Sequence, residues 1–126
     1  MAARIDATFD VSSWDEQPFD EGLGTNRLTR ASVEKRYAGG ITGSSATEWV
    51  MADQPDGTAA FVGMERITGD VGGRTGTLVL QHVGTFADGT ATAALTVLSG
   101  TCALAGSEGT GTMLADPSGR VTLDLG

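Results

Sequence analysis

Residues 61–86, FVGMERITGDVGGRTGTLVLQHVGTF, hold two alternating segments separated by a pair of glycines. Apolar residues recur at every second position around Leu78 and Leu80, and this spacing is typical of a strand with one buried face. Gly72-Gly73 supplies the positive φ that a tight hairpin turn needs. The stretch therefore predicts an antiparallel β-hairpin.

Similar turn signals divide the rest of the chain at regular intervals. They are Gly-Gly, Pro-Asp-Gly, Asp-Gly and Asp-Pro-Ser-Gly, each placed between segments rich in threonine and valine. The apolar spacing of a helix is nearly absent, and only residues 102–106 are predicted to form a helical turn. Strands are expected over residues 5–11, 27–38, 41–52, 58–68, 75–86, 90–98, 112–115 and 120–125.

Eight strands in up-and-down order leave two exposed edges unless the sheet closes on itself. The sequence therefore predicts an all-β protein, a closed antiparallel up-and-down β-barrel of about eight strands that forms one domain over residues 1–126. A lumen of this size either fills with side chains or holds one small ligand. A domain of this length buries enough surface to fold without a metal or a disulfide.

Composition excludes several classes of partner. Sixteen acidic residues against eight basic ones give a net charge of −8, which opposes binding to nucleic acid and to anionic lipid. Residues 1–6 lack the apolar run of a signal peptide, and no stretch approaches the roughly 18 apolar residues of a membrane span. We expect a cytoplasmic protein that binds neither nucleic acid nor membrane.

Cysteine and histidine are too few for a familiar metal site. Cys102 is the sole cysteine and His82 the sole histidine, so no intrachain disulfide and no multi-cysteine zinc site can form. The scattered carboxylates match no ligand spacing either. We predict no metal and no cofactor, and we interpret Cys102 as a small buried or half-buried thiol.

Two titratable residues are the best candidates for a site. His82 shares its alternation phase with Leu78, Leu80 and Phe86, so its imidazole is expected to face the lumen. Glu65 faces the same way by the same reasoning, because it alternates with Phe61 and Ile67. A carboxylate beside a buried imidazole can orient it, tune its pKa or simply satisfy its hydrogen bonds, so catalytic, ligand-binding and structural roles all stay open.

A second carboxylate depends on the register of one strand. If Val50 faces inward, Glu48 does too and lines the lumen; if Trp49 and Met51 face inward, Glu48 is solvated.

The segment Ser12–Asn26 carries acidic and aromatic residues and little strand character. We predict a long loop, either a cover over one barrel mouth or a surface loop pinned by Trp14 and Phe19.

Four apolar residues are expected on the outside of the barrel, namely Val62, Met64, Val79 and Val83. Such side chains prefer contact with a partner to contact with water, so we expect a homo-oligomer.

Several stretches together resemble the bacterial family called domain of unknown function 3224. They are Thr8–Glu16, Leu28–Val33, Pro55–Ala59, Phe61–Arg66 and Leu80–Phe86. The resemblance implies an eight-stranded barrel similar to allene oxide cyclase, in a class that includes cyclases and isomerases, and a family without an established general activity. The chain keeps the family-like residues at Trp14, Glu16, Glu65 and His82. Leu95 stands where family members often carry an aromatic, and we expect this difference to enlarge or reshape the lumen.

Our first interpretation is a barrel whose lumen binds an apolar small molecule oriented by Glu65 and His82. The predicted ligand-binding residues are Trp14, Glu16, Glu48, Phe61, Leu80, Phe86 and Leu95. One rival is a cyclase or isomerase that uses Glu65 and His82 as an acid/base pair; the other is a ligand-free, oligomerising structural module.

Overall fold

The computed structural model describes residues 3–24 and 26–126; Met1, Ala2 and Thr25 lie outside the described residues. Its strands are β1 (Ala3–Asp20), β2 (Arg27–Gly39), β3 (Ile41–Asp53), β4 (Ala59–Val71), β5 (Arg74–Ala87), β6 (Thr90–Gly100), β7 (Gly109–Ala115) and β8 (Gly119–Leu125). A single 3-10 turn, η1 (Cys102–Leu104), lies between β6 and β7, where the sequence predicted a helical turn.

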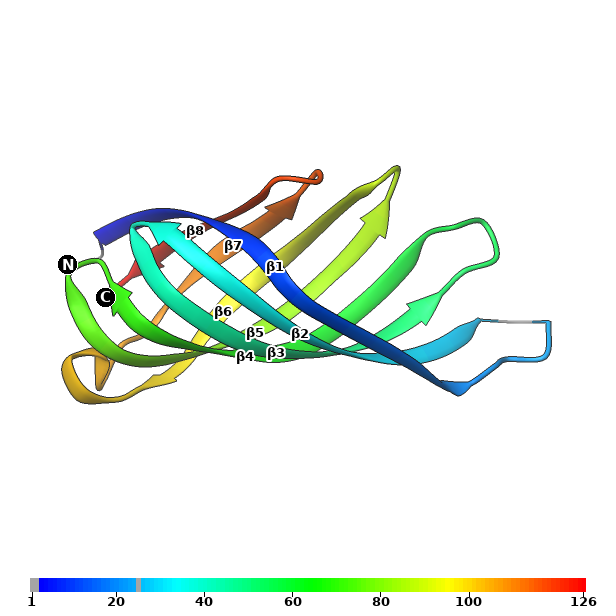
Figure 1. Ribbon diagram of the computed structural model, residues 1–126, viewed down its shortest axis with the longest axis horizontal. Coiled ribbons are helices and arrows are strands. Elements are labelled where there is room, and N and C mark those ends of the chain that lie inside the picture. Colours follow the sequence, from blue (N-terminus) through cyan, green and yellow to red (C-terminus); the bar gives the residue numbers. More distant parts are fainter. Residues whose placement is uncertain (1–2, 25) are drawn as a thin grey trace.

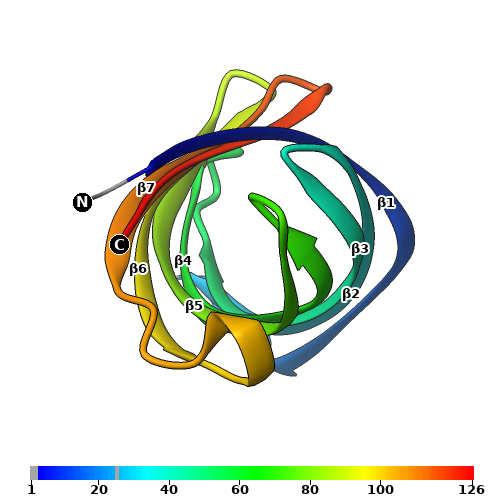
Figure 2. The same cartoon turned by 90° about the vertical axis from the view of Figure 1, so that its left-hand side faces the viewer.

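The strands form a closed barrel in chain order, and each is antiparallel to its neighbours. The barrel closes through β1 and β8, which pair from Ala3↔Leu125 to Phe9↔Gly119; Figure 2 shows the ring end-on. The predicted all-β, eight-stranded antiparallel barrel is therefore confirmed. Figure 1 shows the β1–β2 and β3–β4 hairpins projecting past the other strands at one end, which we call the wide mouth.

Alternating side chains fill the interior. On β2, β3 and β4 every second residue is buried for most of the strand, as expected when one face packs inside a barrel. Two glycines let aromatic rings lie against the wall: a Cβ at Gly63 would fall 2.6 Å from Cδ1 of Trp49, and one at Gly84 would fall 2.6 Å from Cζ of Phe61. Side chains larger than hydrogen at these positions would displace both rings.

The predicted loop over Ser12–Asn26 is wrong for most of its length. β1 continues to Asp20 and pairs with β2 as far as Asp20↔Leu28, with irregular register between Val11 and Ser13 and between Pro18 and Asp20. This extension projects beyond the barrel, so its residues are exposed on both faces except for half-buried Glu16. A strand with two exposed faces lacks the apolar alternation by which strands are recognised in a sequence.

Cys102 also differs from the expectation of a buried or half-buried thiol. It is exposed, because it begins η1 at the end of the barrel and only Leu104 of that turn packs into the core.

In the described part of the chain, no helix is long and apolar enough to span a membrane.

Candidate functional site

A buried cluster of polar side chains surrounds the carboxylate of Glu65 inside the barrel. His82 Nε2 lies 2.8 Å from Oε1 of Glu65, and Nζ of Lys35 lies 3.5 Å from the same oxygen. The hydroxyls of Tyr37 and Ser45 each donate to Oε2 at 2.6 Å. All five residues are buried, so the cluster is an ion pair with neutral hydrogen-bond partners, shielded from water.

The strand registers bring this cluster together. Glu65 on β4 lies opposite Leu80 on β5, two positions from His82, and opposite Thr47 on β3, two positions from Ser45. Residues two apart on a strand point to the same face, so all these side chains enter the lumen. Lys35 enters from β2, where it pairs with Ser45.

Aromatic rings and a sulfur surround the ammonium group of Lys35. Nζ lies 4.5 Å from the ring centre of Phe9, 5.0 Å from that of Trp49 and 3.7 Å from Sδ of Met113. Cation–π attraction of this kind partly replaces the water that a buried ammonium loses. The lumen therefore holds a lysine in a largely apolar setting, opposite a single carboxylate.

Burial and pairing compete in setting the charges of the cluster. Burial raises the pKa of Glu65, but Lys35, His82 and Ser45 outweigh it and hold that pKa at about 2. Burial lowers the pKa of His82 and of Lys35, and contact with Glu65 only partly offsets this. The pKa of Tyr37 is raised well above 10.0, by burial and by the charge of Glu65. At neutral pH Glu65 is therefore ionised, whereas His82 and Tyr37 are neutral.

Three buried polar atoms near this cluster have no hydrogen-bond partner among the described residues. They are Nδ1 of His82, Nε1 of Trp49 and Oγ1 of Thr47. Buried polar groups are nearly always satisfied, so unpartnered ones need an explanation. If the neutral imidazole donates from Nε2 to Glu65, its Nδ1 is left as an acceptor, whereas the indole N–H of Trp49 is a donor.

A cavity of about 440 Å³ opens at the wide mouth. Trp14 and Glu16 line it from β1 and Phe86 lines it from the end of β5; the other lining residues are Arg27, Met51, Asp53, Gln54, Gly57, Thr58 and Ala59. Glu16 is fixed there because its carboxylate accepts hydrogen bonds from Trp14 Nε1 at 3.3 Å and from the Thr29 hydroxyl at 2.7 Å. Apolar rings and a few fixed polar groups thus share one cavity.

A chain of aromatic contacts joins this mouth cavity to the buried cluster. The ring centres of Trp14 and Trp49 are 5.7 Å apart, and those of Trp49 and Phe61 are 5.1 Å apart. Trp49 also meets the ring of His82 edge-on at 5.7 Å. Trp49 therefore lies between the cavity and the Glu65–His82 pair.

The structure places the residues predicted for the site in different parts of the barrel. Glu65 and His82 are in contact, and Phe61, Leu80 and Leu95 are buried in the core around them. Trp14, Glu16 and Phe86 lie at the mouth.

The prediction that Glu48 lines the lumen is wrong. Trp49 and Met51 take the inward phase of β3, so Glu48 points outward, where its carboxylate accepts hydrogen bonds from Arg30 and Ser32.

Four residues of the site were not predicted, although the alternation of their strands places them on the inward face. They are Lys35, Tyr37, Ser45 and Trp49. Lys35 and Tyr37 share the phase of Val33, as Glu65 shares that of Phe61. The run Glu34-Lys35-Arg36 conceals this, because three consecutive charges look like a solvated surface. Among the residues that the structure describes, no group of three or more His, Cys, Asp or Glu side chains could hold a metal ion.

The chain matches a known protein family in sequence and a solved structure in fold. A family model described as "Protein of unknown function (DUF3224)" matches residues 5–126. The chain belongs to the DUF3224 family. Its barrel is similar to the crystal structure of a DUF3224 protein of unknown function from Shewanella oneidensis MR-1, with a TM-score of 0.84 and 26% sequence identity over 100% of this chain and 97% of the other.

No curated protein matches the chain. The specific likeness to allene oxide cyclase stays a prediction. Membership of the DUF3224 family accounts for the fold, and the family description gives no activity.

Proposed function

We propose that this DUF3224 barrel binds an apolar small molecule at its wide mouth, above the Glu65–His82 pair. The mouth cavity is the observation that carries the proposal. Its volume of about 440 Å³ falls within the range of about 300–1,000 Å³ that is usual for small-molecule sites. Trp14, Phe86 and Met51 provide apolar contact surface, and Glu16 and Asp53 provide polar groups at its edge.

The buried polar atoms support a ligand that carries one polar group. Trp49 lies against Trp14 of the cavity wall, and its indole N–H is an unpartnered donor. His82 meets Trp49 and carries an unpartnered Nδ1. A ligand whose apolar body contacts Trp14 and whose polar end reaches Trp49 would satisfy a group that has no partner among the described residues.

Binding can be measured with N-phenylnaphthylamine, a neutral apolar dye whose emission rises in apolar surroundings. We expect saturable binding to the parent protein. Truncation of Trp14 or Phe86 to alanine is expected to weaken it about tenfold, since each removes a large apolar contact worth about 1.5–3 kcal/mol when fully buried and less at a mouth.

Phe19→Ala is the matched control, because Phe19 is an exposed aromatic on the same strand and does not line the cavity. Its affinity for the dye should equal that of the parent protein. Absence of saturable binding to the parent, or equal losses in Phe19→Ala and Trp14→Ala, would overturn the proposal.

One observation favours a second candidate function, an enzyme of the cyclase or isomerase kind. Nδ1 of His82 is unpartnered while Nε2 is held by Glu65. Glu65 is a poor base near neutral pH, because its pKa is about 2 and its oxygens already have four partners. The two roles would therefore divide: Glu65 fixes the imidazole, and Nδ1 of His82 accepts a proton from the substrate.

Nitrobenzisoxazole tests for such a base with a small apolar substrate. A base removes its ring C–H proton, the C–H electrons form the nitrile, and the N–O bond breaks to release a coloured cyanophenolate. If the barrel is a proton-transfer enzyme, the parent protein accelerates this reaction and His82→Ala loses about 100-fold of that rate with dye binding unchanged. If the parent protein reacts no faster than buffer alone, the enzyme hypothesis is contradicted and the small-molecule binding function remains.

A further inference from the structure

One side of the barrel is almost free of charge. β6 and β7 contain no acidic or basic residue, and β5 contains only Arg74, at its first position, and the buried His82. The chain as a whole has sixteen acidic and eight basic residues, which therefore lie almost entirely on other elements. The outer surface of β5–β7 is a neutral face on a strongly acidic protein.

A ridge of exposed apolar side chains borders this neutral face. Val50, Val62 and Val83 are directly paired across β3, β4 and β5, and 47–51% of each residue is exposed. Met64, beside Val62 on β4, is 49% exposed. Val79, which the sequence also placed on this surface, is half-buried. We call Val50, Val62, Met64 and Val83 the apolar ridge.

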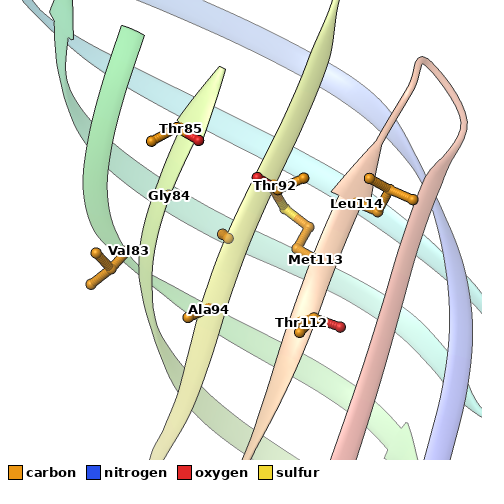
Figure 3. A pocket seen from close by; sticks show the side chains of 9 residues that line it. Val83, Gly84, Thr85, Thr92, Ala94, Thr112, Met113 and Leu114 are labelled. Carbon is orange, nitrogen blue, oxygen red and sulfur yellow. The ribbon is translucent and has the colours of Figure 1, made fainter. Parts of the chain in front are cut away.

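A groove lies beside the ridge on the same face. Its volume is about 570 Å³, and its walls come from β5, β6 and β7, as Figure 3 shows; the lining residues are Val83, Gly84, Thr85, Thr92, Ala93, Ala94, Thr112, Met113 and Leu114. The outward-facing residues of β6 here are Thr92 and Ala94, whose small side chains leave the surface hollow between β5 and β7. Ala94 directly follows Val83 in the ladder that contains the ridge valines.

We propose that this face is the contact surface of a symmetric dimer, in which the apolar ridge of each copy lies in the groove of the other. A two-fold axis makes every contact twice, so a surface that pairs with itself needs both a projection and a matching hollow. The ridge and the groove are neighbours on one face, and a two-fold axis between them joins each ridge to the other copy's groove.

The charge distribution favours a second copy as the occupant. Two molecules of net charge −8 repel each other wherever charged surfaces meet. The residues that line the groove carry no charge, and the charges nearest the ridge, Arg30 opposite Val50 and Glu48 opposite Met64, form an ion pair at 3.3 Å. Contact of ridge with groove therefore joins surfaces of little net charge. Uncharged exposed valines and a methionine are also the residues that gain most from leaving water.

Analytical ultracentrifugation over a range of concentrations tests the dimer. We expect the parent protein to dimerise, and Val62→Lys on the ridge and Ala94→Asp in the groove each to weaken the dimer about 100-fold or more, because each buries an unpaired charge. Val11→Lys is the matched control: Val11 is 49% exposed on β1, away from the neutral face. It should dimerise like the parent protein. Circular dichroism and dye binding check that each variant is folded.

Mixing the two variants tests the pairing of ridge with groove. In the mixed dimer the introduced lysine faces the introduced aspartate at one contact, and the other contact is unaltered. We therefore expect the equimolar mixture to dimerise at concentrations where each variant alone is monomeric. A monomeric parent at all concentrations, dimerisation of Val62→Lys equal to that of the parent, or a mixture that stays monomeric would overturn the proposal.

Discussion

Glu65 is the residue on which the interior of the barrel depends. Its two oxygens bind Lys35, His82, Tyr37 and Ser45, which come from three other strands. A buried carboxylate is tolerated only when it is paired and hydrogen-bonded. Loss of its charge should therefore change the electrostatic environment of all four groups that contact it.

The titration of His82 reports this coupling directly. Burial lowers the pKa of His82, and Glu65 opposes the shift by stabilising the imidazolium. In Glu65→Gln the opposition is lost, so the pKa of His82 should fall further below 6.5 than in the parent protein. NMR of the single imidazole measures both titrations. Coincident curves would mean that the 2.8 Å contact has no electrostatic effect.

The contributions of Lys35 and Glu65 to the free energy of unfolding should be coupled. Lys35→Met keeps a side chain of similar length but leaves the carboxylate without its cation, and Glu65→Gln leaves the ammonium unpaired. We expect each single variant to lose about 3–5 kcal/mol of unfolding free energy and the double variant to recover most of it. Urea denaturation measures all three; additive losses in the double variant would contradict the ion pair.

At this scale the sequence predicted a contact but not its surroundings. Alternation alone placed Glu65 and His82 inward, because a strand has only two faces. It could not reveal which residues on nonadjacent strands point at the carboxylate, since that depends on the tilt and closure of the barrel. Lys35 illustrates the limit: alternation shows which face of β2 it occupies, but its role follows from the 3.5 Å distance between its Nζ and Oε1 of Glu65.

At the scale of single elements, the strands show where sequence patterns succeed. Turn residues predicted the β3, β4, β5 and β6 boundaries to within a few positions, because the turns demand particular residues. The extension of β1 was missed because both of its faces are exposed. Trp14 consequently reaches the mouth cavity from a strand and not from a flexible loop.

Gly63 on strand β4 packs closely against strand β3. An added Cβ would meet the backbone carbonyl of Glu48 and come within 2.6 Å of Trp49, so β3 and β4 would have to separate. We expect Gly63→Ala to lower the unfolding free energy by about 1–3 kcal/mol and to change the fluorescence of Trp49. Gly126→Ala is the control, because its Cβ would meet only the Glu108 carbonyl oxygen, at 3.8 Å. Equal stability of the two variants would show that the indole does not lie on Gly63.

At the scale of the whole molecule, stability should depend on pH through the buried cluster. The pKa of His82 is lower in the folded protein than its ordinary 6.5, so the unfolded chain binds the proton first and stability falls as the pH drops below 6.5. The pKa of Glu65 is about 2 against an ordinary 4.5, so a further loss of a few kcal/mol follows between pH 4.5 and 2.

Chemical denaturation at a series of pH values measures this profile. His82→Gln should remove the loss of stability that begins below pH 6.5, and Glu65→Gln should remove the loss between pH 4.5 and 2. A parent stability that stays constant from pH 7 to pH 4 would contradict the buried, neutral state of His82.

The proposed function requires that a small molecule enters the wide mouth and reaches the indoles above the Glu65–His82 pair. A proton–nitrogen correlation spectrum contains the two indole N–H signals, from Trp14 and Trp49, which Trp14→Phe assigns. On titration with N-phenylnaphthylamine we expect both signals to shift along one saturation curve, since the two rings lie 5.7 Å apart beside one cavity. If both indole signals stay unmoved while the dye binds, the mouth is not the binding site.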